Sequence, residues 1–156
     1  MKRLFICMAM LLLATQALAQ GKIILDYKGM AFGKEMTDSK YMMKAREQGD
    51  LTFYTRYGED HNFQGVPVKD QYYGYVGNKF CVAMFSAQGP SSYNALKAYF
   101  DANYGPARQP KVNVKKFSYD AGDVEIQLEY DDNTKVAGVS YVYTPIMRQV
   151  MTPKKK

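Results

Sequence analysis

Apolar and polar residues alternate most regularly between Val124 and Tyr130. Positions 124, 126, 128 and 130 are apolar and share one face of a strand, whereas positions 125, 127 and 129 are Glu or Gln and share the other. This pattern is typical of an antiparallel sheet that packs one face on a core and leaves the other in water. The last third of the chain is therefore predicted to contain a half-buried strand.

The same criterion predicts several other strands along the chain. They lie at residues 22–27, 51–56, 71–76, 79–87, 112–119, 124–130 and 136–143. Between two of them stands Gly77–Asn78, a pair that favours a tight hairpin turn because both turn residues need positive φ. Residues 37–46 are compatible with a helical turn or with an edge strand, and residues 57–65 are polar and predict a loop.

One helix is predicted, from Ser91 to Tyr104. Apolar residues at positions 93, 96, 100 and 104 form a helical stripe, and Gly105 and Pro106 stop the helix. Ser91 or Ser92 is expected to cap its first turn. The predicted fold is thus α+β: a single domain over residues 20–146, with a twisted antiparallel sheet of about six strands and this helix packed on one face.

The first 19 residues have the pattern of an export signal. Lys2 and Arg3 precede an apolar run over residues 4–14, and Ala17-Leu18-Ala19 has the small residues of a cleavage site. Cleavage between Ala19 and Gln20 would release a periplasmic or secreted protein without a stable membrane anchor. Residues 147–156, which include Lys154 to Lys156, are expected to form a basic, mobile tail.

The basic excess lies mostly at the two ends of the chain. There are 21 Lys and Arg residues against 15 Asp and Glu, a net charge of +6, of which the signal holds two and the terminal Lys run three. The remaining body of the chain therefore has a charge of only +1. A nucleic-acid-binding domain concentrates its positive charge on a folded surface, so nucleic acid is not the expected partner.

A single cysteine remains after removal of the signal. Cys7 lies in the signal, which leaves Cys81 and no possible internal disulfide. Cys81 stands in an apolar run and is expected to be a buried small hydrophobe. A catalytic thiol would need a histidine partner, and the chain offers only His61.

The chain contains 14 Tyr and no Trp. Tyrosine suits a half-buried sheet, with its ring in the core and its hydroxyl group at the edge, so an aromatic-rich sheet is one interpretation. The other is an exposed platform for a sugar or a protein partner, for which Tyr72, Tyr73 and Tyr75 are the candidates.

The only candidate for acid–base chemistry is the loop Glu59-Asp60-His61. Neighbouring carboxylates can raise the pKa of an imidazole and prepare it as a general acid or base, although acidic residues are equally typical of turns. Asp131-Asp132-Asn133-Thr134 lacks the spacing of a calcium loop. With no nucleophile elbow, paired-cysteine or paired-histidine motif and no phosphate-binding glycine loop, no metal or cofactor is predicted.

The order of several short motifs resembles that of a known group of proteins. These motifs are Phe32-Gly33, Tyr54-Thr55-Arg56, Gly65-Val66-Pro67-Val68, Tyr73-Gly74-Tyr75, Lys79-Phe80, Tyr104-Gly105-Pro106 and Ile126-Gln127-Leu128-Glu129-Tyr130. They resemble a group of small exported bacterial proteins of unknown function, over nearly the whole chain after the signal, and this resemblance implies no catalytic residue. A weaker likeness is to the outer-membrane assembly lipoprotein and β-lactamase-inhibitor type of fold. The cysteine that bears the lipid in the lipoprotein type is missing here.

Taken together, the sequence predicts a non-enzymatic binding or interaction module of the bacterial cell envelope. Its partner would be an envelope protein or a glycan, bound through the open sheet face or through the loop at residues 57–65. One alternative is an exported enzyme or enzyme accessory that uses Glu59, Asp60 and His61. Another is an inhibitor of a secreted enzyme, which requires exposed tyrosines on a concave sheet face.

Overall fold

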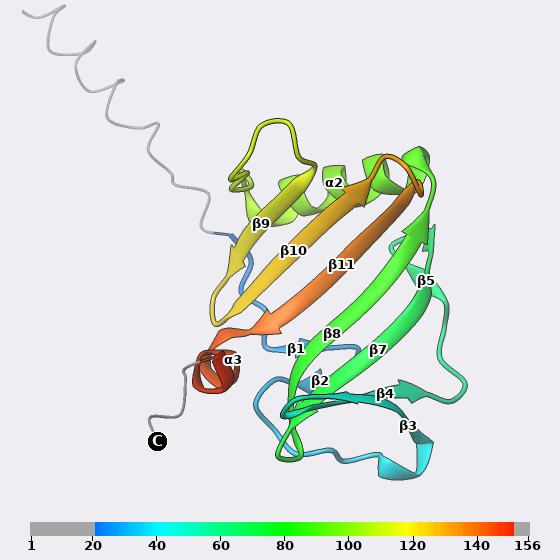
Figure 1. Cartoon of the computed structure of the whole chain (residues 1–156), viewed down its shortest axis with the longest axis vertical. Helices are drawn as coiled ribbons and strands as arrows, with labels where there is room; N and C mark the ends of the chain where they lie inside the picture. Colours follow the sequence, from blue (N-terminus) through cyan, green and yellow to red (C-terminus); the bar gives the residue numbers. More distant parts are fainter. Residues whose placement is uncertain (1–20, 152–156) are drawn as a thin grey trace, which may run out of the picture.

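Seven antiparallel strands form the main sheet, in the order β3-β4-β7-β8-β11-β10-β9 (Figure 1). Their bounds are β3 Met42–Gln48, β4 Leu51–Arg56, β7 Lys69–Val76, β8 Lys79–Gln88, β9 Lys116–Ala121, β10 Val124–Asp131 and β11 Val136–Tyr143. The computed structural model describes residues 21–151. The predicted export signal and the run from Lys154 to Lys156 lie outside these residues.

The strand that the sequence left open is β3. It follows a single 3-10 turn, η1 (Ser39–Tyr41), and pairs with β4 at one edge of the sheet, with a register shift between Lys44 and Arg46. All but the first of its residues are exposed, so it lacks the apolar face by which strands are recognised in a sequence. The main sheet has seven strands, where about six were predicted, and the strand predicted at residues 22–27 is not one of them, since only Asp26–Tyr27 form a strand there, outside the main sheet.

The other main strands lie close to their predicted positions, and the hairpin at Gly77–Asn78 is confirmed with positive φ at both residues. Only β9 begins late, at Lys116 and not at residue 112. The preceding segment is a loop, in which the Gln109 side-chain amide donates to the carbonyl groups of Val112 and Val114 over 3.2 and 3.0 Å. These local bonds replace the pairing of a strand.

Two small hairpins lie outside the main sheet. β1 (Asp26–Tyr27) pairs with β2 (Met30–Ala31), and β5 (Asn62–Phe63) pairs with β6 (Val66–Pro67). Each is closed by two residues with positive φ, Lys28–Gly29 in the first and Gln64–Gly65 in the second. This turn geometry matches the twist of paired strands, so each hairpin holds its tip residues in fixed positions.

Helix α2 (Pro90–Tyr104) runs across one end of the sheet and buries Leu96, Phe100 and Tyr104 (Figure 1). The predicted serine cap is wrong: the capping residue is Gly89, no side chain caps the helix, and Pro90 occupies its first turn. Proline fits there because its missing N–H group would have had no partner in the helix. Gly105, with φ of 78°, ends the helix as predicted.

The main core lies on the sheet face that carries α2 and the β1–β2 hairpin. Aromatic rings fill this core, as expected if the tyrosines belong to an aromatic-rich sheet. The ring centroids of Phe32 and Phe80 lie 4.6 Å apart in a stacked pair, and those of Phe100 and Tyr119 lie 5.6 Å apart. The α+β class with a large antiparallel sheet is thus confirmed.

A smaller cluster, Phe53, Cys81 and Val82, lies on the opposite face of the sheet. It is covered by a helix that the sequence did not predict, α3 (Thr144–Met151), through Ile146 and Met147. The mobile tail predicted for residues 147–156 is therefore wrong for residues 147–151, which belong to this helix. Pro145 ends the preceding strand but is tolerated in the first turn of a helix, where its missing N–H group needs no partner. Neither α2 nor α3 is long and apolar enough to cross a membrane, and the described residues form no other α-helix.

Candidate functional site

The tyrosines proposed as an exposed platform do not form one. Tyr73 and Tyr75 have exposed fractions of 0% and 3% and lie in the main core. Tyr72 lies on the opposite face, where the Arg46 guanidinium group stands 5.2 Å from its ring. The reason is the alternation of β7, which sends positions 73 and 75 inward together and position 72 outward. The open sheet face thus receives only one of these three tyrosines.

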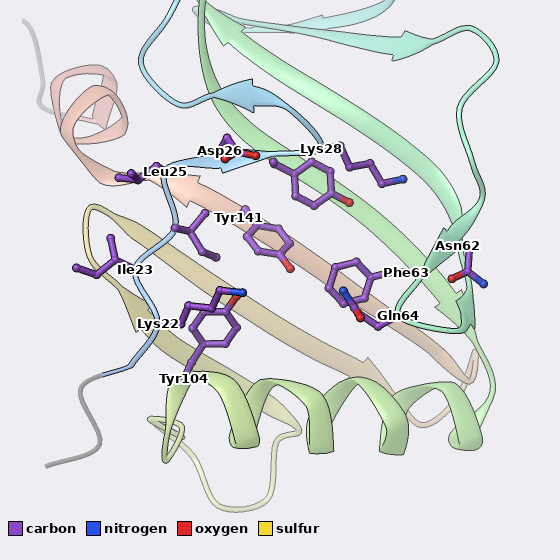
Figure 2. Close-up of a pocket in the computed structure, with 12 residues that line it drawn as sticks. Lys22, Ile23, Leu25, Asp26, Lys28, Asn62, Phe63, Gln64, Tyr104 and Tyr141 are labelled. Atoms are coloured by element: carbon purple, nitrogen blue, oxygen red, sulfur yellow. The ribbon is translucent and has the colours of Figure 1, made fainter. Parts of the chain in front are cut away.

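One pocket lined by polar and aromatic groups lies under residues 22–28, which we call the strap. The pocket under it, the strap pocket, has a volume of about 360 Å³. The strap forms one wall, the tip of the β5–β6 hairpin forms a second, and Tyr104 and Tyr141 complete the lining (Figure 2). Figure 2 shows the rings of Tyr104, Tyr141 and Phe63 gathered in this space from α2, β11 and β5.

The strap is held by hydrogen bonds to segments far away in the sequence. The backbone N–H group of Lys22 donates to the Asn103 carbonyl group, and that of Ile24 donates to the Ala121 carbonyl group, each over 3.2 Å. Gly21 packs so tightly that a Cβ atom there would lie 3.0 Å from the Tyr104 carbonyl oxygen. A side chain at this position would push the strap away from the end of α2.

Buried tyrosine hydroxyl groups surround the strap pocket. The rings of Tyr27 and Tyr141 lie 4.9 Å apart. Burial raises the pKa of Tyr141 well above its ordinary value, and burial together with Tyr99 raises the pKa of Tyr104 to about 12. These groups stay protonated at physiological pH, so each can donate and accept a hydrogen bond.

A second hollow, the Glu59 hollow, adjoins the strap pocket. It is lined by Lys28, Tyr41, Arg56, Tyr57, Gly58, Glu59 and Asp60 and has a volume of about 410 Å³. Lys28 lines both spaces. Tyr41 and Tyr57, with exposed fractions of 43% and 73%, supply the exposed aromatic rings that the sequence assigned to β7.

Lys28 organises the wall between the two spaces. Its ammonium group lies 3.0 Å from Glu59 Oε1 and donates to the Asp60 carbonyl oxygen at 3.0 Å and to Gln71 Oε1 at 2.7 Å. An ammonium group has three donors, so these three acceptors use all of them. Lys28 therefore neutralises Glu59 and fixes the loop.

The three candidate residues of the acid–base loop point in different directions. Glu59 turns inward, with 5% of its side chain exposed, whereas Asp60 and His61 are exposed. Nδ1 of His61 lies 3.3 Å from Nε2 of Gln71, which also donates to the Asp60 carbonyl oxygen at 2.9 Å. The structure brings His61 to an amide group, and within residues 21–151 His61 forms no ion pair with a carboxylate.

Two buried polar atoms at this wall remain without a hydrogen-bond partner among the described residues. The Tyr73 hydroxyl group donates to Oε1 of Glu59, but Oε2 of the same carboxylate and the hydroxyl oxygen of Tyr27 have none. Burial, and then the negative charge of Glu59, raise the pKa of Tyr27, so its hydroxyl group keeps its proton. Unsatisfied buried groups are rare in folded proteins and are unfavourable where they occur.

Within residues 21–151, no three His, Cys, Asp or Glu side chains are grouped so that they could hold a metal ion. We found no match to this chain among protein-family models, curated proteins or solved structures. The site must therefore be interpreted from its own geometry.

Sequence reasoning missed Lys28 and Gln71. The available signals were Lys28–Gly29 and Gln64–Gly65, each a pair ending in glycine between more apolar residues, which is the pattern of a tight hairpin. Recognition of these two hairpins would have placed Tyr27 and Phe63 in paired positions close to rigid turns.

Proposed function

We propose that this protein is a non-enzymatic binding module of the bacterial cell envelope, exported by residues 1–19, and that it holds a small ligand between the strap pocket and the Glu59 hollow. This proposal keeps the resemblance to small exported bacterial proteins of unknown function. The loop at residues 57–65, expected from the sequence as one possible binding surface, contributes residues to both spaces.

The observation that carries this proposal is the pair of buried unpartnered atoms, Oε2 of Glu59 and the hydroxyl oxygen of Tyr27. A buried polar atom without a partner destabilises the folded state by about 1–3 kcal/mol. Polar groups retained at this expense are frequent at binding sites, where the ligand supplies the missing partner. Tyr27 lines the strap pocket and Glu59 lines the Glu59 hollow, so a ligand in either space contacts one of these two residues.

The arrangement favours binding over catalysis. General acid–base chemistry needs a group that can exchange a proton within hydrogen-bond reach of a substrate. Here all donors of Lys28 are used, His61 contacts an amide, and the pKa of both Tyr27 and Tyr73 is raised. The enzyme alternative would need Glu59 to act alone.

The test is capture from the native compartment. The full chain is expressed in a bacterium, purified from the envelope fraction and studied by native mass spectrometry, which also reports whether residues 1–19 have been removed. We expect a retained small molecule that is lost in Tyr27→Phe. Tyr130→Phe is the matched control, because the Tyr130 hydroxyl oxygen is also buried without a partner but its residue lines neither space.

Retention of the same molecule by Tyr27→Phe, or recovery of protein partners only, would contradict the proposed site. Recovery of the chain from the cytoplasm with residues 1–19 intact would contradict the proposed export.

A further inference from the structure

We propose that a third pocket binds copper(I), a soft monovalent cation, through the thioether sulfur atoms of Met30, Met36 and Met42. None of these three residues lines the strap pocket or the Glu59 hollow. The inference therefore goes beyond the proposed function and does not depend on it. It follows from the residues that line this pocket, from the anchoring of its walls and from the charges around it.

The pocket, which we call the methionine pocket, lies between residues 29–38 and the main sheet. It has a volume of about 200 Å³, and the three methionines line it together with Tyr75 and Phe80. All three methionines are partly buried and pack against the main core. Residues 21–151 contain seven methionines, so this one small space collects three of them.

Backbone hydrogen bonds fix the segment that carries Met36 over the turn between β7 and β8 (Figure 1). The N–H group of Met36 donates to the Asn78 carbonyl group over 3.3 Å, and that of Gly33 donates to the Phe80 carbonyl group over 2.7 Å. This wall of the pocket is therefore held by the hairpin beneath it.

Met30 and Met42 belong to two strands on other sides of the pocket. Met30 lies in β2, and its Sδ atom accepts a hydrogen bond from the Tyr75 hydroxyl group at 3.5 Å. Met42 is the first residue of β3, where it pairs with Arg56 of β4. A methionine side chain is unbranched and has three rotatable bonds. In a space only a few atoms across, thioethers on three anchored segments can therefore turn toward one ion.

Thioether sulfur is a selective ligand. Methionine and cysteine sulfur are soft donors that favour copper(I), whereas the oxygen donors of carboxylates and carbonyl groups favour Mg²⁺ and Ca²⁺. The rings of Tyr75 and Phe80, which line the same pocket, attract a cation to their faces. The groupings that residues 21–151 lack are those of His, Cys, Asp and Glu, so their absence does not bear on a site made of thioethers.

The charges around the methionine pocket favour a cation of low charge. The charged residues that line it are two basic ones, Lys34 and Arg56, and two acidic ones, Glu35 and Asp38, so their charges sum to zero. The Arg56 guanidinium group lies 3.9 Å from a carboxylate oxygen of Asp38. Thioethers carry no charge, so copper(I) would add one positive charge to this space and Zn²⁺ would add two. Uncompensated charge in a partly enclosed space is unfavourable, which adds to the preference for the monovalent ion.

The first experiment uses silver(I), which shares the charge and the sulfur preference of copper(I) and is not oxidised by air. The full chain is prepared with ¹³C in its methionine methyl groups and with Cys7→Ala, so that this thiol does not compete if residues 1–19 are retained. Cys81 needs no substitution, because it is fully buried and burial raises the pKa of its thiol to about 11.

We expect the methyl signals of Met30, Met36 and Met42 in nuclear magnetic resonance spectra to shift on addition of silver(I). The shifts should end at one equivalent, and the other methyl signals should stay in place. Single substitutions by leucine assign the three signals. Zn²⁺, added in the same way, should leave all three unchanged.

The second experiment measures affinity for copper(I) itself, by competition with a coloured copper(I) chelator in the absence of oxygen. Met36→Leu removes one sulfur atom and conserves volume, so the variant should fold. Loss of a hydrogen bond to a metal ligand typically weakens metal binding by about 10- to 100-fold, so loss of a ligand should weaken it by at least about 10-fold. The control is Met84→Leu, which should leave the affinity unchanged, because Met84 packs on the opposite face of the sheet and does not line this pocket.

Each other outcome overturns the inference. If silver(I) shifts none of the three signals, or shifts those of other methionines instead, the site is wrong. Equal shifts with Zn²⁺ would show that the pocket does not select a soft ion. If Met36→Leu and Met84→Leu bind copper(I) as tightly as the wild type, the thioethers are not its ligands. The small-ligand site is tested by Tyr27→Phe, so either proposal can fail while the other stands.

Discussion

The hydroxyl group of Tyr73 donates its hydrogen bond to Oε1 of Glu59, although the β5–β6 hairpin separates the two residues in the sequence. This bond and the ammonium group of Lys28 are the partners that hold the Glu59 carboxylate beneath the surface. Tyr73 is thus a support of the site and not the exposed contact expected from the sequence.

Replacing Tyr73 by Phe should lower the free energy of unfolding by about 1–3 kcal/mol, because the buried carboxylate then loses one of its two partners. Chemical denaturation monitored by circular dichroism measures this change. Tyr130→Phe is the control and should leave the stability unchanged or slightly increase it. Equal stabilities of the Tyr73 and Tyr130 variants would show that the bond to Glu59 contributes nothing.

Two strand glycines should respond oppositely to alanine. A Cβ atom at Gly74 would lie 3.0 Å from Val82 Cβ and 3.1 Å from Phe53 Cε1, whereas nothing lies within 4 Å of one at Gly138. Gly74→Ala should therefore destabilise the protein by about 1–3 kcal/mol through overpacking. Gly138→Ala should stabilise it by about 0.4–1 kcal/mol, because alanine has less freedom in the unfolded chain. Thermal unfolding of the two variants tests this; destabilisation of both by the same amount would contradict it.

The buried tyrosines should make the fold sensitive to alkali. Burial, the first cause in each case, raises the pKa of Tyr75 and of Tyr104 from 10.0 to about 12. Between about pH 10 and about pH 12 the unfolded chain loses phenolic protons that the folded chain keeps. The free energy of unfolding is therefore at its full value below about pH 10 and falls above it. Each tyrosine should contribute a loss of up to about 1.4 kcal/mol per pH unit.

Urea unfolding at pH values from about 8 to about 11 measures this slope, and phenolate absorbance reports the ionisation. The double variant Tyr75→Phe and Tyr104→Phe should show a shallower decline than the wild type. A free energy of unfolding that stays constant up to pH 11 would contradict the interpretation.

Cys81 should be unreactive in the folded protein. It is fully buried, it is the extra residue where the pairing of β7 and β8 shifts register, and its burial raises the pKa of the thiol to about 11. Because the thiolate is the reactive form, an alkylating reagent at neutral pH should modify Cys81 only after unfolding. Intact mass before and after addition of denaturant checks this, and rapid labelling of the native protein would disprove it.

The parts of the fold that follow a simple period could be predicted from the sequence. β10 has a strict alternation, α2 has an apolar stripe and a glycine stop, and Gly77–Asn78 closes its hairpin as expected. β3 and α3 could not, because β3 is exposed on both faces at an edge and α3 has a proline, a residue that also ends strands, in its first turn. In both, tertiary contacts decide the structure and leave little trace in the local pattern.

The site was predicted only in part. The loop that contains Glu59 and His61 was singled out correctly as polar, but which side chain turns inward depends on Lys28 and Gln71, and these belong to other segments. Likewise, the alternation of β7 predicts that Tyr72 and Tyr73 face opposite sides, but not which side is covered. The covered side is the one on which α2 and the β1–β2 hairpin pack, and Tyr73 faces that side.

The position of the strap has a consequence for the order in which the molecule is assembled. Lys22 and Ile24 bond to Asn103 and Ala121, which leave the ribosome much later. Residues 22–28 therefore reach their native position only after these partners have been synthesised, and the strap pocket, whose lining includes Tyr141, is complete only after β11 has been made. A nascent chain that ends before β9 would lack Ala121, whose carbonyl group accepts the hydrogen bond from the backbone N–H group of Ile24.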